Sequence, residues 1–308
     1  MNITELNYTI QNEKIDEFIR VCEARQVKAL SKIADDISGR PGIRLVLLAG
    51  ASSAGKTTTA KRLATQLRVN GLTAMHLSTD DYFVGNSRNP RDENGEFDYE
   101  RVDCVDMPRL AHDLNTLLDG GKVHLRKFDF VEHEGYDSRR ATSLAKNGVV
   151  ILEGIHALNP ILVEGVDDSF KYRMFIEPKT QLTVFATSRL PPADGRLLRR
   201  LVRDNQFRKL SPVETFKTWP KVLAGERKWI DPFRKYADAE FDSGLEYELA
   251  VLKLYAAGLL EIVKMRMPEE SKAQTLAALL GAILPADPAK VPGDSILRET
   301  IGGSQLEY

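Results

Sequence analysis

The sequence is poor in cysteine, nearly balanced in charge and free of long hydrophobic runs. Two cysteines, Cys22 and Cys104, stand among 308 residues, which excludes a disulfide-rich scaffold and favours a reducing compartment. The formal net charge of −1 gives no basic field that would attract nucleic acid or an anionic membrane. No apolar run approaches the roughly 18 residues of a membrane-spanning helix, and the polar first residues do not resemble a signal peptide. We therefore expect a soluble, cytoplasmic protein with no nucleic-acid or membrane partner.

Short apolar runs alternate along the chain with longer segments of helical spacing. The runs that are typical of strands are 43–49, 72–78, 122–130, 148–154 and 172–177. The segments that predict helices are 12–37, 55–69, 107–119, 180–189, 194–206, 211–225, 245–263 and 271–284. Residues 83–103 are polar and predict a long surface loop, a kind of segment that is often functional. The alternation predicts an α/β fold in which helices flank a parallel β-sheet.

The segment VLLAGASSAGKTTTAKRLA, residues 46–64, fits the pattern G-x-x-x-x-G-K-[ST] between a predicted strand and a predicted helix. The glycines allow the loop to wrap its backbone N–H groups around phosphate oxygens. Lys56 would reach the β- and γ-phosphates of a nucleoside triphosphate, and the Thr57 hydroxyl would bind Mg²⁺. The residues expected to form this phosphate loop are Gly50, Ala51, Ser52, Ser53, Ala54, Gly55, Lys56, Thr57 and Thr58.

Acidic residues follow two of the predicted strands. Asp80 and Asp81 come after the strand at 72–78, and Glu153 ends the apolar run VVILE. Because ligands bind at the carboxyl ends of parallel strands, we expect these acids near the phosphate loop. Adjacent residues of an extended chain point to opposite sides, so one aspartate would face the site and orient an acceptor hydroxyl. A polar turn and an ordinary acid at a strand end remain the alternatives.

Four arginines recur at helical spacing in the segment RLLRRLVRDNQFRK. They are Arg196, Arg199, Arg200 and Arg203. Spacings of three and four place three of them on one helix face, where they could offset the charge of a triphosphate. The alternative is a basic helix face in solvent. Nucleic-acid binding is disfavoured because no aromatic residues interleave with the arginines.

Proteins with a phosphate loop include GTPase switches, ATPase motors and small-molecule kinases. The guanine-reading pattern N-K-x-D is absent from the sequence, and the D-x-x-G match at 92–95 lies in a polar loop. A motor would carry an acidic pair at the end of an apolar strand, whereas here Glu153 stands alone. These features favour a kinase.

Seven segments, taken in order, resemble the uridine kinase and phosphoribulokinase family of P-loop kinases. They are GASSAGKTT, STDDYF, FDYERVD, FDFVEH, ILEGIHAL, DGRLLRRLVRD and RKYADAEF, and they span roughly residues 43–243. The resemblance implies a P-loop NTPase-type parallel sheet flanked by helices, with a helical lid at about 191–228. It also implies an enzyme that uses ATP and Mg²⁺ to phosphorylate a small alcohol, by default the 5′-hydroxyl of uridine or cytidine.

The resemblance assigns expected roles residue by residue. The catalytic residues would be Asp80 as the base, with Lys56 and Arg203. The Mg²⁺ ligands would be Thr57, Glu153 and Asp80. Arg199 would contact the nucleotide. The residues that would bind the acceptor are Asp98, Phe128, Phe130, His133, Arg200 and Arg208.

Some segments depart from the family pattern and leave the acceptor open. Phe128 stands where uridine kinases carry tyrosine, and the segment QFRKL replaces the usual continuation of the lid. A sugar phosphate or another nucleoside is therefore an alternative acceptor, and a nucleotide sensor with little turnover is an alternative function. We expect an N-terminal helical extension at 1–40, a kinase domain at 41–263 and a helical tail at 264–308. These ends resemble longer bacterial proteins with a uridine-kinase-like domain, and a homo-oligomer is possible.

Overall fold

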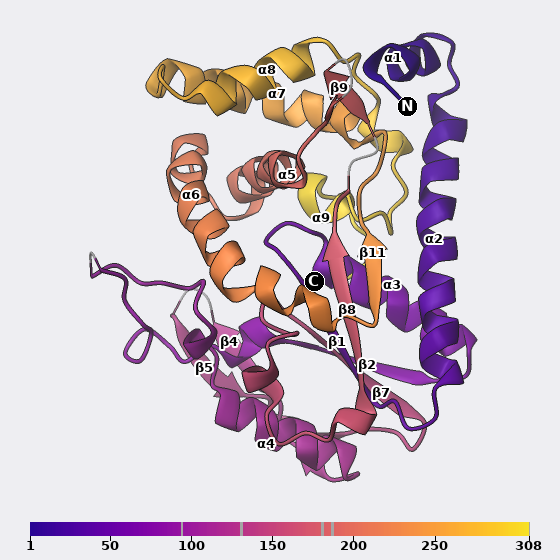
Figure 1. The fold of residues 1–308 in the computed structure, drawn as a ribbon, viewed down its shortest axis with the longest axis vertical. Coiled ribbons are helices and arrows are strands. Elements are labelled where there is room, and N and C mark those ends of the chain that lie inside the picture. Colours follow the sequence, from indigo (N-terminus) through magenta and orange to yellow (C-terminus); the bar gives the residue numbers. More distant parts are fainter. Residues whose placement is uncertain (94, 130–131, 180–181, 186–187, 308) are drawn as a thin grey trace.

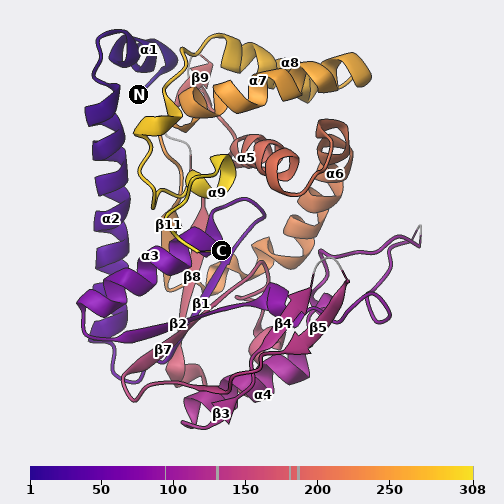
Figure 2. The same cartoon turned by 180° about the vertical axis from the view of Figure 1, so that it is seen from behind.

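A five-stranded parallel sheet forms the centre of the computed structural model, which describes residues 1–93, 95–129, 132–179, 182–185 and 188–307. The strands lie in the order β11 (Ala239–Asp242), β8 (Lys171–Glu177), β1 (Leu45–Gly50), β7 (Gly148–Glu153) and β2 (Thr73–Ser78). Every neighbouring pair is parallel. Helices pack on both faces of this sheet, so the predicted α/β fold with a flanked parallel sheet is confirmed (Figures 1 and 2).

The alternation of apolar residues along β1 explains the two faces. Leu45 and Leu47 belong to one apolar core, together with α4 (Met107–Leu118). Val46 and Leu48 belong to another, together with α2 (Ile15–Gly39) and α3 (Lys56–Val69). Successive side chains of a strand point to opposite faces, so a strand that is apolar throughout requires helices on both sides.

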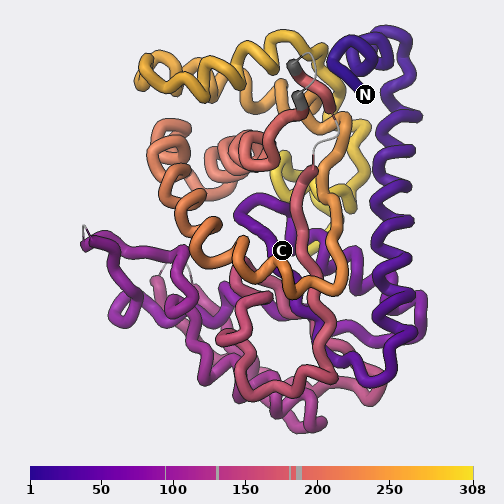
Figure 3. The backbone as a smooth tube through the Cα atoms, in the orientation of Figure 1, coloured from indigo at the N-terminus to yellow at the C-terminus, as the bar shows by residue number. Residues whose placement is uncertain are grey.

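A third apolar core lies beyond the sheet and is built mainly from helices. It joins α1 (Ile3–Gln11), α5 (Pro192–Phe207), α6 (Pro212–Trp229), α7 (Glu248–Arg266), α8 (Ser271–Gly281) and α9 (Arg298–Ile301). Leu6 near the N-terminus and Leu276, Leu297 and Ile301 near the C-terminus are all buried in it. The chain after α8 turns back to the middle of the molecule, where α9 lies, whereas the N-terminus lies at the far end beside α1 (Figures 1 and 3).

Two predicted elements differ in the structure. The helix predicted at 180–189 is wrong in its described part, which forms β9 (Thr183–Phe185) and β10 (Ser188–Arg189), whereas 180–181 and 186–187 lie outside the described residues. The β-branched and aromatic residues of Thr183–Phe185 favour a strand. The strand predicted at 122–130 is divided into β3 (Lys122–Val123), which pairs with β6 (Thr142–Ser143), and β4 (Arg126–Asp129), which pairs with β5 (Glu134–Asp137).

Short 3₁₀ turns connect many of these elements. They are η1 (Thr79–Tyr82), η2 (Val102–Cys104), η3 (Pro160–Val163), η4 (Asp168–Phe170), η5 (Asp231–Tyr236) and η6 (Pro288–Lys290). Among the described residues, none of the helices combines the length and the apolar character that crossing a membrane requires.

Candidate active site

The phosphate loop runs from the end of β1 to the start of α3, and two of its glycines are sterically required. A Cβ on Gly50 would lie 2.5 Å from the carbonyl oxygen of Ile176 in the neighbouring strand. Gly55 has a φ of +87°, a left-handed conformation that side chains rarely adopt. This geometry turns the chain so that α3 begins at Lys56 with its first N–H groups facing the loop.

Side chains from distant segments hold the loop in place. The Ser243 hydroxyl donates a hydrogen bond of 2.6 Å to the carbonyl oxygen of Ala54. From α5, Arg200 Nη1 donates to Ser52 Oγ at 2.9 Å, and Arg196 Nη1 donates to the Ser52 carbonyl oxygen at 3.3 Å. The loop is therefore clamped between α5 and the segment after β11.

Lys56, Thr57 and Glu153 meet where β1 and β7 end. The Thr57 hydroxyl donates a hydrogen bond of 2.9 Å to Glu153 Oε1, and Lys56 Nζ lies 3.3 Å from the Ala51 carbonyl oxygen. Burial raises the pKa of Glu153 to about 7, with a smaller contribution from Asp80, while the charge of Lys56 opposes the rise. Residue 154 has to be glycine, because a Cβ there would lie 1.9 Å from the Thr79 hydroxyl oxygen.

Asp80 and Asp81 lie in the 3₁₀ turn η1, so the expectation that they continue an extended chain is wrong. The turn begins when Ser78 Oγ accepts a hydrogen bond of 3.3 Å from the backbone N–H of Asp80. Asp81 is directed to β4, where its Oδ2 accepts from Lys127 Nζ at 2.7 Å. Asp80 instead lies within the electrostatic reach of Lys56.

The surroundings of Asp80 suit a carboxylate that works beside a cation. Its side chain is reached by solvent, yet the protein atoms around it are numerous enough that desolvation raises its pKa. The charges of Lys56, Arg208 and Arg203 pull the pKa down again, and Asp81 raises it.

The four arginines of α5 each pair with a carboxylate, which excludes the alternative of a basic helix face in solvent. Arg196 Nη2 donates to both carboxylate oxygens of Glu226, at 2.7 and 2.8 Å, and Arg199 binds the buried Glu248. Their side chains are 3% and 2% exposed. The four arginines therefore do not form a single row facing a triphosphate, because Arg196 and Arg199 bind mainly to carboxylates of the protein.

Asp204 organises the remaining arginines and was not among the residues selected from the sequence. Its fully buried carboxylate lies 2.7 Å from Arg203 Nη2, 3.2 Å from Arg200 Nε and 3.6 Å from Arg208 Nε. Arg208 is 54% exposed and so is the most open of the three. The acid that ends the motif DGRLLRRLVRD was the signal in the sequence for this role.

Three of the expected acceptor residues, Asp98, Phe128 and His133, lie in the loop after η1 and in the hairpin of β4 and β5. Two others, Arg200 and Arg208, lie in α5 and at its C-terminal end. Asp98 Oδ1 accepts a hydrogen bond of 3.2 Å from the backbone N–H of Glu100. The Phe83 ring joins the two segments, because its centroid lies 5.7 Å from that of Phe128 and 6.4 Å from that of Tyr99.

One of these residues, His133, lies at the tip of the same hairpin. His133 is partly buried with a φ of +55°. Phe130 lies outside the described residues. Phe83 therefore links Phe128 to the loop that contains Asp98, and His133 lies at the hairpin tip.

Two titratable residues near this loop, Glu100 and His156, were not predicted from the sequence as site residues. Glu100 is partly buried, and its pKa is raised to about 7 by desolvation and by Asp98, against the opposing charges of Arg200 and Lys56. His156 is 2% exposed, and burial lowers its pKa to about 4. Neither ring nitrogen of His156 has a hydrogen-bond partner in the described part of the chain. Nearby backbone groups raise its pKa and so oppose part of the effect of burial.

Sequence comparison places the chain among kinases. The model of the phosphoribulokinase / uridine kinase family matches residues 45–250. A uridine kinase of Deinococcus deserti is 29% identical over 198 residues, which cover 64% of this chain and 86% of that protein. A uridine kinase of Lactobacillus johnsonii is 27% identical over 208 residues, which cover 67% of this chain and 90% of that protein.

Among solved structures, a possible uridine kinase from Bacillus stearothermophilus is 19% identical with a TM-score of 0.47, over 71% of this chain and 98% of that one. A putative fructose transport system kinase from Silicibacter sp. TM1040 is 18% identical with a TM-score of 0.47, over 68% and 98%. The match of the family model covers most of the chain and the motifs described above. The chain therefore belongs to the phosphoribulokinase / uridine kinase family of P-loop kinases.

Proposed function

We propose that this kinase transfers the γ-phosphoryl group of ATP to the hydroxyl of a small molecule, namely the 5′-hydroxyl of a nucleoside. The observation that carries the proposal is the meeting of three strand ends at one place. Lys56 follows β1, Glu153 ends β7, and the turn with Asp80 follows β2. Ligands of parallel sheets bind at this edge.

The residues present fit a magnesium ion held together with the phosphates. Mg²⁺ prefers oxygen ligands and usually takes few from the protein. The Thr57 hydroxyl and the Glu153 carboxylate already lie 2.9 Å apart, and Asp80 contributes to the pKa of Glu153, so three oxygen-bearing side chains are close together. Among the described residues, no set of three or more His, Cys, Asp or Glu forms a metal cage by itself, as expected for a site completed by phosphates and water. When bound, Mg²⁺ would offset phosphate charge.

The chain's own residues would provide positioning and charge. The N–H groups at the start of α3 and the Lys56 ammonium would hold the phosphates. Asp80 would orient the acceptor hydroxyl and accept its proton as the phosphoryl group leaves the donor. Arg203, held by Asp204, would offset the charge that develops during transfer.

The acceptor is proposed to be uridine or cytidine by default. Two relatives that this chain matches over most of their length are named uridine kinases. These names support a nucleoside as the acceptor. Asp98 would accept hydrogen bonds from ribose hydroxyls. Since Phe128 carries no hydroxyl for the base, other nucleosides and sugar phosphates belong in the same test.

A panel of acceptors tests the proposal directly. The protein is incubated with MgATP and one acceptor at a time, drawn from nucleosides and sugar phosphates, and each acceptor is examined for a mass increase of one phosphoryl group. We expect ADP release to depend on the acceptor and a nucleoside to give the largest yield. If only a sugar phosphate is phosphorylated, the acceptor is a sugar phosphate and not a nucleoside. If no acceptor changes the rate of ADP release, the proposal is contradicted.

Two variants locate the donor and acceptor halves. Lys56→Ala should nearly abolish transfer, because it removes the charge on the β- and γ-phosphates. Asp98→Ala should raise the acceptor KM about 10- to 100-fold and leave ATP affinity nearly unchanged, since a hydrogen bond to a charged group is worth about 1.5–3 kcal/mol. Asp103→Ala is the matched control, because Asp103 is an exposed acid of the same loop that pairs with Arg101. An unchanged acceptor KM in Asp98→Ala would remove Asp98 from the site.

A further inference from the structure

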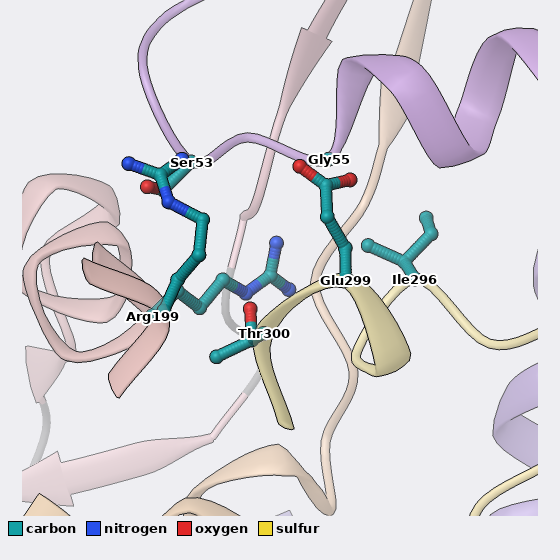
Figure 4. Close-up of a pocket in the computed structure, with 7 residues that line it drawn as sticks. Ser53, Gly55, Arg199, Ile296, Glu299 and Thr300 are labelled. Carbon is teal, nitrogen blue, oxygen red and sulfur yellow. The ribbon is translucent and has the colours of Figure 1, made fainter. Parts of the chain in front are cut away.

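The end of the chain lies against the phosphate loop. We define the C-terminal tail as residues 293–307. Glu299 in α9 accepts a hydrogen bond of 2.9 Å from the hydroxyl of Thr58, although the two residues are 241 positions apart. Ile296 lies so close to the loop that a Cβ on Gly55 would be 2.5 Å from its Cγ2. Figure 4 shows Ile296 and Glu299 reaching from the tail toward the loop.

The tail is firmly packed in this position. Ile296, Leu297 and Ile301 are buried in the apolar cores on either side of the loop. Ser295 Oγ lies 3.2 Å from the Tyr247 hydroxyl, and Gln305 N–H donates to the Gly293 carbonyl oxygen at 2.8 Å. The backbone that carries Glu299 is therefore held against the loop, whereas the Glu299 side chain is only partly buried.

A small cavity separates the tail from the loop and the lid. Its lining comprises Ser53, Gly55, Arg199, Arg203, Ile296, Glu299 and Thr300, and its volume is about 10 Å³. This is room for about one water molecule, so no part of a nucleoside fits between the tail and the loop.

Two polar atoms of this lining are buried without a hydrogen-bond partner among the described residues. They are Arg199 Nη1 and Ser53 Oγ. Arg199 is 1% exposed, and its other donors bind Glu248 and the Ser243 carbonyl oxygen. A buried guanidinium N–H with no acceptor is costly, so Arg199 Nη1 is suited to donate a hydrogen bond to an anionic or hydroxyl oxygen.

Glu299 places a negative charge at the N-terminal end of α3, which is the end of a helix that attracts anions. The first N–H groups of a helix and its dipole favour a carboxylate or a phosphate alike. Thr58 is the third residue of α3, at the turn that would face the donor phosphates. A carboxylate on that turn repels the phosphates and occupies the Thr58 hydroxyl.

We propose that the C-terminal tail is a built-in competitor for the donor site, in which Glu299 holds the Thr58 end of α3 and has to leave it when a nucleoside triphosphate binds. This inference rests on the proposed function, because it takes the phosphate loop as the donor site. It makes Glu299 a residue that sets donor affinity. The apparent dissociation constant equals the intrinsic one divided by the fraction of molecules in which Glu299 does not cover the site.

Titration calorimetry with MgATP tests the competitor in the full-length chain. Glu299→Gln keeps the size of the side chain and removes its charge, so we expect MgATP to bind about two- to tenfold more tightly, the effect of one charge at a helix terminus. The difference should shrink at high salt, because screening weakens interactions between charges that solvent reaches. Asp294→Asn is the matched control, since it removes one exposed acid from the same tail and should leave the affinity unchanged.

Lys56→Ala separates this inference from the proposed function. If the unmodified chain binds MgATP, Lys56→Ala does not, and Glu299→Gln binds equally or more weakly, the competitor is overturned while the donor site stands. Binding by Glu299→Gln in the absence of binding by the unmodified chain would support the competitor most strongly. No binding by either would overturn both proposals. Circular dichroism of Glu299→Gln and a second variant, Glu299→Ala, verifies that the tail remains folded.

Discussion

Lys127 Nζ lies 2.7 Å from Asp81 Oδ2, and this ion pair joins β4 to the turn that follows β2. The pair engages one of two adjacent aspartates and leaves Asp80 within reach of Lys56. We therefore expect Asp80→Asn to lose about 10²- to 10⁴-fold in kcat, because asparagine cannot accept the acceptor proton. MgATP affinity, measured by calorimetry, should survive.

Asp81→Asn is the matched control for this prediction. It removes the same charge one residue away, but it breaks only a surface-accessible ion pair with Lys127, whose side chain is 47% exposed. We expect a much smaller loss in kcat. The opposite ranking of the two variants would transfer the role of the base to Asp81.

Arg203 offers a test of charge stabilisation by the lid. Arg203→Ala should lower kcat more than it weakens MgATP binding, because an interaction that is strongest in the transition state contributes mainly to kcat. Steady-state kinetics beside calorimetry measure the two effects. Arg227→Ala is the control, because Arg227 is an exposed arginine of α6. A proportional loss of kcat and affinity would indicate that Arg203 only binds the donor.

The buried pair of Arg199 and Glu248 predicts a large effect on stability. Removing one partner leaves a buried charge alone, which costs about 3–5 kcal/mol. Glu248→Leu and Arg199→Met should each lower the free energy of unfolding by about this amount in chemical denaturation. The double variant should recover most of the loss, because neither charge then remains buried. Additive losses in the double variant would contradict this account.

His156 predicts a dependence of stability on pH. Burial lowers its pKa to about 4 in the folded state, whereas an unfolded histidine titrates near 6.5. Between these values the unfolded chain binds a proton that the folded chain refuses, so stability falls as the pH drops from about 6.5 to 4. The loss from this group amounts to at most about 3 kcal/mol.

Replacing His156 with leucine should flatten that part of the curve. Chemical denaturation at several values of pH between 4 and 7 measures the free energy of unfolding of both proteins. His76, whose pKa is also lowered to about 4, contributes with the same sign, so the test is the difference between the two curves. Parallel curves would show that His156 is not the titrating group.

Local sequence determined the central part of the fold. The runs that become β1, β2, β7 and β8 are apolar and short, and the glycines of the phosphate loop stand where a Cβ or an ordinary φ would be excluded. Such features depend on neighbouring residues and on the period of apolar side chains, and both are readable along the chain. The same local signals identified the family before any contact between distant segments was known.

Elements with weak periodicity could not be read in this way. The edge strand Ala239–Asp242 is short and half polar, so it was not predicted, and its pairing with β8 decides its conformation. Asp80 and Asp81 were predicted as extended chain, but the side chain of Ser78 initiates a turn. In both cases tertiary or side-chain contacts override a weak local preference.

Only the tertiary structure decided which charges meet. Spacing along one helix could place Arg196 and Arg199, but not the partners Glu226 and Glu248 that pair with them. Nor could it bring Glu299 to Thr58, because a contact across 241 residues depends on the packing of the tail, and not on any local period. Composition and motif therefore determined that this is a P-loop kinase, whereas the environment of each functional side chain depended on burial and charge pairing between segments far apart in the sequence.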